Sequence, residues 1–595
     1  MNQSVYTLRM VKRLVLDHKV AVFLALLTAL VVVLPQIYFR IDHSRDGVYQ
    51  GIELLPDSPW SPRVREVQDG YPSLGSIYYK DGKDNPYLFQ PLGTMVWGYI
   101  GKIFFLDINN TFLFSRFILT CIVSLLIYVF VILISKNKLA ALCSMVVILL
   151  ADSILSYSGM FKIIHAIRPE DFLSIGKPVN TMISIPFFGF LIAFWFFYRN
   201  GYWRYGLLSA LLLGLNFYNY FYTWTFLFAF LGILGFICLV QKKWQEVINI
   251  AGVCVGGVLV AIPYLINLYR ATEHPVYEVA SMRFGIVLSH APLFIGFVAV
   301  VALIIFVYGF EREDRKTYFF GLALLLTPLV TLNQQIVTGK LMQAGHYHWY
   351  FHKPLAVIFT LIIVFSILSK SKLKTYQELC ALIIITISIA TGVFIQIDSY
   401  YNSTIDGGAA LIERQRYGSS MRWLDENAKK DAVVFANDEI SHITVIYTSL
   451  NVMYHRSAYA TLSATEERLL DALFLFYRLR GISHDSVRDT FYKDREYLSV
   501  NLYGVYYAHL AHSVAAIPDE KIEEIILRYQ ETLTVGTVTW IQNIFKKYEV
   551  EYVVWDKKVN PEWQIEKLPF LTEVAVFDDV VIYQFSHDTM VGRGE

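Results

Sequence analysis

The chain has 595 residues, of which 55% are hydrophobic, 16% aromatic and only 17% charged, and its formal net charge is +1. This composition excludes a disordered chain, a coiled coil and a nucleic-acid binder that relies on bulk positive charge, because each of these needs many more charged or polar residues. An integral membrane protein with room for a soluble domain fits the numbers. The five cysteines all lie in apolar runs, so they predict neither a disulfide framework nor a zinc cluster.

The apolar runs predict a polytopic α-helical membrane protein with about 11 transmembrane helices. A bilayer core of about 30 Å requires roughly 20 apolar residues of helix. The first run, Val20 to Phe39, follows a short basic segment and lacks a small-residue cleavage site, so we interpret it as a retained span. The other spans are expected at about 112–135, 139–157, 181–198, 205–222, 223–240, 247–268, 286–309, 317–333, 353–369 and 376–397.

The charged loops set the predicted orientation in the membrane. The apolar run at about 91–106 is short and interrupted by glycines, so we expect it to lie along the interface. Five short loops rich in Lys and Arg then share one side, which is the cytoplasmic side because positive residues are retained there. We therefore expect a cytoplasmic N-terminus, an extracytoplasmic C-terminus and residence in the cytoplasmic (plasma) membrane. The outer loops are long and polar, and they comprise 40–111, 158–180, 269–285 and 334–352.

The chain divides into two predicted domains, a membrane module at 1–397 with a large first external loop at 40–111, and an extracytoplasmic α/β domain at 398–595. Ser463 and Glu466 match a capping box that would begin a helix. The tail contains no sequence pattern for a phosphate loop or a nucleophile elbow, so we expect it to bind or cover a ligand. Helices are predicted at 411–428, 463–480, 518–532 and 538–548, and strands at 431–436, 551–555, 575–577 and 580–585.

Three stretches and the overall layout resemble the glycosyltransferase-C (GT-C) superfamily, whose polytopic members take sugars from polyprenyl-phosphate donors. The stretches are Ile41–Asp46 just past the first span, Asp84–Pro91 before the interfacial run, and Met421–Asn427 before the first strand of the tail. The layout covers most of the chain, whereas the motifs are loose. The resemblance thus points to a superfamily and to no particular sugar.

The resemblance implies an inverting transfer of a hexosyl or pentosyl group from a polyprenyl-phosphate donor to a glycan, lipid or protein acceptor. Membrane lipids are expected partners, and nucleic acid is not. The resemblance also implies a catalytic carboxylate early in the first external loop, where Asp42 and Asp46 both fit; a local ion pair with Arg40 or Arg45 is the alternative. No Asp-Glu pair or Asp-x-Asp triplet occurs at 40–50, so no metal ligand is assigned, and a divalent cation stays an open alternative.

The departing phosphate needs cations to stabilise it, and the acceptor hydroxyl needs a base. Arg168 is our first candidate because Arg grips phosphate in a bidentate manner, whereas Lys acts as a point charge. A surface ion pair of Arg168 with Glu170 or Asp171 is the alternative. The other cations predicted on the outer side are Lys177, Arg283, Lys340 and Lys353.

The segment 334–353 is the most unusual stretch of the sequence. His346 and His348 are candidates for donor-phosphate contact, and they could also bind a divalent ion. Aromatic rings stack on sugar faces, so candidate sugar or acceptor contacts are Tyr347, Trp349 and, in the first loop, Tyr87. The alternative is an aromatic belt at the membrane interface. We favour that belt reading for the run at 216–224.

Two other classes of function compete with an external glycosyltransferase. A lipid-linked substrate flippase or transporter would need charged residues inside its spans, and the spans are almost free of them, with Asp152 the main exception. A non-catalytic membrane scaffold would use the tail to recruit partners and would tolerate changes at the Asp and His candidates. The sequence favours the enzyme.

Overall fold

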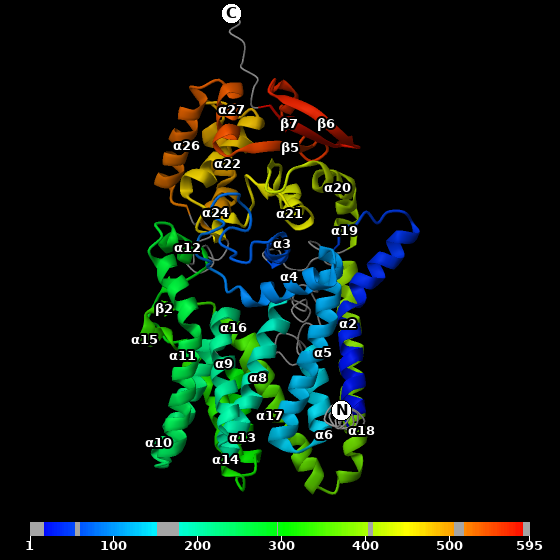
Figure 1. The fold of residues 1–595 in the computed structure, drawn as a ribbon, viewed down its shortest axis with the longest axis vertical. Helices are drawn as coiled ribbons and strands as arrows, with labels where there is room; N and C mark the ends of the chain where they lie inside the picture. Colours follow the sequence, from blue (N-terminus) through cyan, green and yellow to red (C-terminus); the bar gives the residue numbers. More distant parts are fainter. Residues whose placement is uncertain are drawn as a thin grey trace, which may run out of the picture.

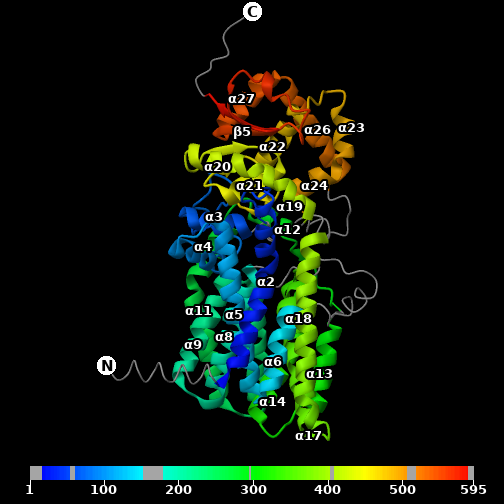
Figure 2. The same cartoon turned by 90° about the vertical axis from the view of Figure 1, so that its right-hand side faces the viewer.

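The computed structural model describes residues 17–53, 60–151, 178–293, 296–402, 408–504 and 517–586. A long helical bundle forms one end of the molecule and a mixed α/β domain forms the other (Figure 1). Figure 2 shows the same two regions after a quarter turn, with α3 and α4 again between them. The end of the predicted span at 139–157, and with it Arg168 and Lys177, lies outside the described residues.

Each of the predicted apolar runs contains a helix in the described residues. Seven candidate spans there are long and apolar enough to cross a membrane, while α6 and α13 are shorter apolar helices. The number of helices that cross stays a prediction. The bundle consists of α2 (Lys19–Arg45), α5 (Ile108–Ser135), α6 (Lys138–Val146) with the π-helix η1 (Val147–Ala151), α8 (Pro178–Asn200), α9 (Trp203–Asn219), α10 (Phe221–Val240), α11 (Trp244–Thr272), α13 (Phe297–Gly309), α14 (Arg315–Thr331), α17 (Lys353–Lys370) and α18 (Gln377–Asn402).

The outer surface of the bundle is apolar, as a lipid-facing surface must be. Phe236, Leu259 and Ile367 are among many large hydrophobic side chains that stay more than half exposed on α10, α11 and α17. A water-soluble monomer rarely exposes so much contiguous apolar surface. The fold is therefore that of a polytopic α-helical membrane protein with a C-terminal α/β domain, as predicted.

The short basic loops meet one another at the end of the bundle away from the α/β domain. Arg199, in the last turn of α8, pairs with Asp314 between α13 and α14. Lys316 lies 4.0 Å from Glu246 at the start of α11. Lys370 at the end of α17 pairs with Glu311. Loops distant in the sequence thus share one end, which is the clustering expected from the positive-inside pattern.

Helices α3 (Trp60–Asp69) and α4 (Leu92–Phe104) lie between the bundle and the α/β domain (Figure 1). Helix α4 is the apolar run that we expected along the interface. Its 13 residues are too few to span a bilayer core. Glycines let α3 approach it closely, because a Cβ atom added at Gly98 would lie 2.5 Å from a methyl of Val67.

The predicted span at 286–309 is wrong at its beginning. Val287–Leu288 form a short strand, β1, which pairs antiparallel with β2 (Lys340–Leu341). Helix α13 begins only at Phe297, after Gly296 adopts a left-handed conformation with φ of 115°. A residue with a side chain rarely adopts this conformation, so the glycine sets the boundary.

The α/β domain is built on a five-stranded sheet with the order β4-β3-β5-β7-β6. Strand β3 (Val433–Phe435) pairs in parallel with β4 (Asn451–Val452) and with β5 (Val550–Asp556). Strands β6 (Leu571–Phe577) and β7 (Val580–Phe585) extend the sheet as the predicted antiparallel hairpin. The helices are α19 (Gly408–Arg414), α20 (Gly418–Asn427), α21 (Asp438–Tyr447), α22 (Glu466–Leu479), α23 (Val487–Lys493), α24 (Arg495–Tyr503), α26 (Asp519–Leu533) and α27 (Thr537–Lys547).

Two predictions for this domain are corrected. The single helix expected at 411–428 is divided by the 3₁₀ turn η6 (Gln415–Tyr417). The capping box at Ser463 is wrong, because Thr465 accepts the hydrogen bond from the Arg468 amide and begins α22. Ser463 instead contacts Asn85 of the first loop, at 3.2 Å. Helices α21, α23 and α24 were not predicted.

The first loop and the α/β domain share one hydrophobic core. Tyr78 and Trp97 belong to the same buried cluster as Phe435 and Tyr454. The Tyr78 ring stacks on His455 with centroids 3.9 Å apart. The loop that follows α2 is therefore packed into the C-terminal domain. The predicted division of the chain at residue 398 stays a prediction.

Candidate functional site

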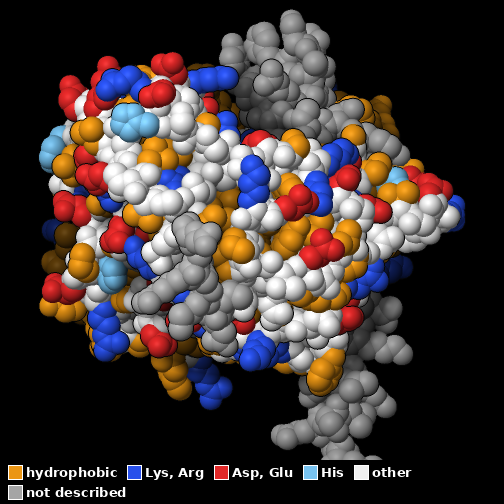
Figure 3. Space-filling view, turned by 90° about the horizontal axis from the view of Figure 1, so that it is seen from above, with side chains coloured by type: hydrophobic (Ala, Val, Ile, Leu, Met, Phe, Trp, Pro, Cys, Tyr) orange, Lys and Arg blue, Asp and Glu red, His pale blue; other side chains and the backbone are white. Residues whose placement is uncertain are grey.

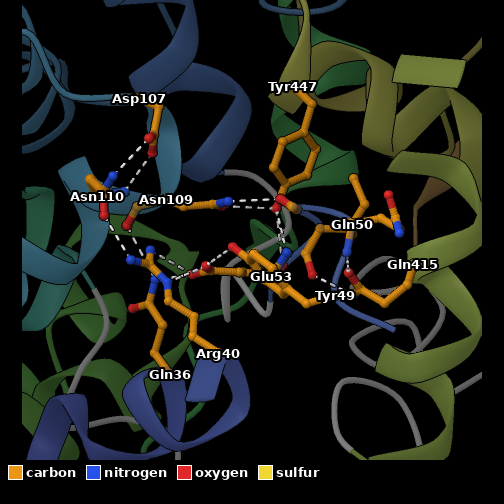
Figure 4. Close-up of polar contacts among 12 residues, drawn as sticks. Gln36, Arg40, Tyr49, Gln50, Glu53, Asp107, Asn109, Asn110, Gln415 and Tyr447 are labelled. Atoms are coloured by element: carbon orange, nitrogen blue, oxygen red, sulfur yellow. Dashed lines mark hydrogen bonds and ion pairs between the residues drawn. The ribbon is translucent and has the colours of Figure 1, made fainter. Parts of the chain in front are cut away.

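A buried polar network joins the end of α2 to the α/β domain. Its centre is the Glu53 carboxylate, whose side chain is 1% exposed (Figure 4). Gln36 and Arg40 reach it from α2, and Tyr49 reaches it from the connecting loop. The sequence analysis did not identify Glu53.

Both oxygens of Glu53 are occupied by donors. Gln36, Arg40 and Tyr49 all donate to the carboxylate through short contacts, and Arg40 Nη2 adds a second bond at 3.0 Å. Burial and the neighbouring Glu53 charge raise the pKa of Tyr49, which keeps its hydroxyl protonated as a donor. Both carboxylate oxygens are therefore engaged within the protein, and the Glu53 side chain ties the connecting loop to α2.

The same network reaches the beginning of α5. Arg40 Nη1 donates to Asn110 Oδ1 at 2.7 Å. Asp107 caps α5 by accepting the Asn110 amide at 2.8 Å. Asn109 Nδ2 donates to the Gly51 carbonyl at 2.7 Å. The ends of two membrane helices are therefore tied to each other and to the loop that carries Glu53.

Side chains of the α/β domain complete the network by bonding the backbone of the first loop. The Glu53 amide donates to Tyr447 Oη at 2.9 Å. The Gln50 amide donates to Gln415 Oε1 at 2.9 Å, and Gln415 Nε2 donates to the Ile52 carbonyl. The backbone of the first loop is thus held by side chains from two segments, α21 and η6, that lie more than 360 residues away in the sequence.

The two candidate catalytic carboxylates lie on the last turn of α2, next to this network. Asp42 is half-buried, whereas Asp46 is exposed at the C-terminal cap of the helix. Arg40 does not pair with Asp42, because its guanidinium is committed to Glu53 and Asn110. Among the described residues, neither candidate side chain forms a hydrogen bond or an ion pair.

The predicted phosphate-binding cations are placed in different surroundings. Lys340 is exposed on β2. Lys353 is 5% exposed at the beginning of α17, inside the bundle. Arg283 is buried and donates to the Ala464 carbonyl at 2.8 Å, so it joins α12 (Tyr277–Arg283) to the α/β domain. Arg168 and Lys177 lie outside the described residues and stay predictions.

His346 lies in an aromatic cluster that the sequence did not reveal. Tyr220 Oη forms a short hydrogen bond with His346 Nδ1, and the Tyr222 ring stacks on His346 with centroids 4.8 Å apart. Tyr347 Oη lies 2.7 Å from Thr225 Oγ1. The run at 216–224, interpreted as an interfacial belt, therefore contributes Tyr220 and Tyr222 to the packing around His346.

The residues after His346 form the π-helix η4 (His348–His352), which leads directly into α17. The rings of His348 and His352 are 6.5 Å apart, and His352 Nε2 lies 3.1 Å from Thr331 Oγ1. π-Helical turns are rare in proteins, and those that do occur are often found at functional sites. Trp349 is 59% exposed, as an interfacial or ligand-contacting ring would be.

Tyr87 is half-buried and packs on Tyr264 of α11, with ring centroids 6.4 Å apart. Its backbone amide and carbonyl are both bonded to the Asn267 side chain. Across the described residues, no three His, Cys, Asp or Glu side chains gather as a metal site would require. The divalent cation stays the open alternative that the sequence left, and a chelation experiment tests it.

The fold and this network define a polytopic membrane protein whose first loop is clamped between a helical bundle and an α/β domain. A polytopic helical bundle followed by an α/β domain is the fold class that the sequence predicted. No protein-family model and no curated protein sequence matches the chain.

Solved structures that are similar to the chain include the following three, each at 12% sequence identity. The oligosaccharyltransferase of Archaeoglobus fulgidus has a TM-score of 0.48, covering 91% of this chain and 69% of that one. The mycobacterial arabinofuranosyltransferase AftD has a TM-score of 0.46, covering 96% of this chain and 40% of that one. ArnT of Cupriavidus metallidurans has a TM-score of 0.39, covering 92% and 97%. Function must be argued from the residues of this chain.

Proposed function

We propose that the protein is a membrane glycosyltransferase that moves a sugar from a polyprenyl-phosphate donor to an extracytoplasmic glycan, lipid or protein acceptor. The observation that carries the proposal is the position of Asp42 and Asp46. Both carboxylates end the first membrane helix, between the apolar bundle and the α/β domain, and neither is engaged by a described neighbour.

The chemistry follows from these groups. A carboxylate of α2 takes the proton of the acceptor hydroxyl as that oxygen attacks the anomeric carbon. The bond from this carbon to the phosphate oxygen breaks, and polyprenyl phosphate leaves with inversion at the carbon. We assign the base to Asp42 before Asp46, because the half-buried residue is better shielded from water. The Arg40–Glu53 network keeps the helix end in place.

The departing phosphate needs positive charge or hydrogen-bond donors. We propose Arg168, Lys340, Lys353, His346 and His348 for this role, with Tyr347, Trp349 and Tyr87 as contacts to sugar or acceptor. The buried position of Lys353 and the π-helix before it support the assignment. The orientation proposed from the basic loops, with the N-terminus cytoplasmic, puts the α/β domain on the outer side of the membrane.

One observation favours a second candidate, transport of a lipid-linked substrate. Lys353 and His352 are buried within the bundle, and polar groups at such depth can line a pathway. A flippase would move a labelled polyprenyl-phosphate sugar between the leaflets of a proteoliposome with Asp42 and Asp46 both replaced. A glycosyltransferase would not require that movement.

The test is separate replacement of Asp42 and Asp46 by Asn, with release of polyprenyl phosphate measured in native membranes that contain the acceptor. Loss of a catalytic base lowers the rate by about 10²–10⁴-fold. We expect this loss for Asp42→Asn. The matched control is Asp485→Asn, which alters a fully exposed carboxylate of the α/β domain. Full activity in both α2 variants would remove the proposed mechanism.

A further inference from the structure

The α/β domain contains a cleft of about 800 Å³ that no step above uses. It opens where the parallel strands end at their carboxyl side. Asp438 and Glu439 follow β3, Arg456 comes shortly after β4, and Asn560 follows β5. In open α/β sheets, ligands bind in the crevice outside the carboxyl ends of the strands.

The charges that line the cleft cancel. Four arginines and four carboxylates contribute to its wall, namely Arg414, Arg416, Arg456, Arg480, Glu413, Asp438, Glu439 and Glu562. Acidic and basic side chains are also intermixed over the face of the domain that looks away from the bundle (Figure 3). A polyanionic ligand would meet as many carboxylates as guanidinium groups, so the lining suits a ligand without net charge.

Most of these polar groups are held in fixed positions by one another. Arg414 pairs with Glu439, and Arg416 pairs with Asp556 at the end of β5. Asn437 Nδ2 donates to Asn560 Oδ1 at 2.9 Å. Donors and acceptors fixed in this way bind a ligand at a lower entropic cost than mobile surface side chains do.

Two groups of the cleft have hydrogen-bonding capacity that the described residues do not use. Arg456 is exposed and forms no ion pair with a described residue. Asp438 Oδ1 is buried and has no hydrogen-bond partner among the described atoms, and burial raises the pKa of Asp438. Unsatisfied buried polar atoms are uncommon in native proteins and call for an explanation. A ligand hydroxyl can donate to Asp438 while another accepts from Arg456.

The cleft also offers an aromatic surface. Tyr497 is 38% exposed, and its hydroxyl lies 3.2 Å from Tyr454 Oη, which holds the ring in one orientation. Phe476 lines the same cavity and is half-buried. Rigid rings beside paired donors and acceptors match a molecule that has both C–H faces and hydroxyl edges.

We propose that this cleft binds a neutral oligosaccharide, which in the proposed reaction is part of the acceptor. The inference rests on the proposed function only in calling the ligand an acceptor. The binding of an oligosaccharide in the cleft does not depend on that function. The cavity is within the size range of clefts that enclose drug-sized ligands, so it has room for a short chain of sugars.

The cleft is linked to the membrane end of the molecule through η6. Arg414 and Arg416 line it, and Gln415 between them bonds the backbone of Gln50 and Ile52 in the first loop. An acceptor held in the cleft is therefore held by the same segment that fixes the loop after Asp42 and Asp46. This arrangement would let one end of a glycan bind while the other end approaches the donor.

The test uses the full-length protein in detergent micelles with four neutral tetrasaccharides as probes: maltotetraose, cellotetraose, mannotetraose and xylotetraose. A tetrasaccharide of heparin serves as the anionic comparison. Calorimetry gives the affinities, and hydrogen exchange locates the site. We expect saturable binding of at least one neutral probe, with protection of the backbone at 437–440 and 559–563. Absence of binding by all four at millimolar concentration, or stronger binding of the heparin fragment, would overturn the proposal.

Three variants connect the binding to the cleft. Arg456→Ala and Asp438→Asn should each weaken the affinity by about tenfold, the effect of losing one charge-assisted hydrogen bond. Tyr497→Ala should weaken it through loss of the ring. The matched control is Arg488→Ala, which breaks an exposed pair with Glu523 outside the cleft. Equal affinities in Arg456→Ala and Arg488→Ala would place the sugar elsewhere and contradict the proposal.

The two proposals fail in distinguishable ways. If Asp42→Asn and Asp46→Asn retain transfer but tetrasaccharides still bind, the catalytic proposal fails and the cleft stands. If transfer depends on Asp42 and no tetrasaccharide binds, the cleft proposal fails alone. If both hold, Arg456→Ala should raise KM for a glycan acceptor about tenfold and leave kcat unchanged.

Discussion

Tyr447, the last residue of α21, places its hydroxyl 2.9 Å from the backbone nitrogen of Glu53 and 3.1 Å from the carbonyl oxygen of the same residue. A side chain of the α/β domain thus bonds both backbone polar groups of a first-loop residue, as a neighbouring backbone segment would. The Asn109 side chain of α5 lies 3.1 Å from the same hydroxyl. One oxygen atom therefore connects the domain, the loop and a membrane helix.

Replacing Tyr447 with Phe should destabilise the protein by about 1–3 kcal/mol, because the Glu53 amide then loses its partner in a buried site. The measurement is the free energy of unfolding in mixed micelles. Tyr492→Phe is the control, since Tyr492 bonds Glu523 at the surface. Equal stability of the two variants would show that the Tyr447 hydroxyl has no structural role.

Arg40→Met should cost about 3–5 kcal/mol, because it leaves the Glu53 carboxylate buried without its cation. We expect lower yields of folded protein and faster proteolysis between α2 and α3. Arg488→Ala removes an exposed pair and should change the stability by less than about 1 kcal/mol. If the Arg40 variant behaved like the Arg488 variant, the network would not hold the loop.

Gly418→Ala should separate the first loop from the α/β domain. Gly418 has ordinary helical backbone angles, so alanine would normally strengthen the helix. The added Cβ would instead lie 2.3 Å from the Gln50 carbonyl oxygen. We expect a lower melting temperature in the variant. At Gly536, where an added Cβ meets nothing within 4 Å, the same change should have little effect, which provides the control.

Acidification should destabilise the α/β domain through His442 and His455. Ser457 donates its amide to His455 Nδ1, so the proton of His455 is on Nε2, which points at His442 Nδ1 at 3.2 Å. Burial lowers the pKa of His442 to about 4, with smaller effects from Arg414 and Arg456, and burial also lowers the pKa of His455 well below its usual value. Both rings are therefore neutral in the folded protein.

The sign of the effect follows from these lowered pKa values. An unfolded histidine binds a proton below a pH of about 6.5, whereas folded His442 does so only near 4, so the unfolded state gains protons first. Stability should fall as the pH decreases through this window. The check is the melting temperature between pH 7 and pH 4.5. A His442→Gln variant should lose less stability over the same range, and an equal loss would contradict the assignment.

The proposed orientation predicts which end of the molecule is accessible from outside the cell. Asp485→Cys, in the α/β domain, should react with a membrane-impermeant maleimide in intact cells. Lys372→Cys, in the basic loop between α17 and α18, should react only after the membrane is opened. The parent chain is the control, because its five cysteines are buried or half-buried. The reverse labelling pattern would invert the topology.

The elements that the sequence predicted best are those governed by local composition. Apolar runs of membrane length became helices, and the hairpin around Asp578 and Asp579 formed where turn residues interrupt two strands. Errors arose where a boundary depended on a single residue. Gly296 sets the beginning of α13, and Thr465 caps α22 where Ser463 was expected.

The candidate carboxylates Asp42 and Asp46 could be located from the sequence because they lie just past an apolar run of known length. Glu53 could not, because nothing in the residues beside it distinguishes it from other loop acids. Its partners come from α2, from the connecting loop itself and from α21, where Tyr447 is 394 positions away. The cleft likewise depends on the order β4-β3-β5, which no local pattern encodes.

The sequence by itself determined that this chain enters a membrane many times, that its short loops are basic and that an α/β tail follows. These properties depend on hydrophobic length and charge, which each segment carries alone. Only the tertiary structure decided that the first loop is clamped by Tyr447 and Gln415, that Tyr220 meets His346, and that a cleft opens at the sheet edge. Such contacts depend on which side chains packing brings within a few ångströms, and that is a property of the whole chain.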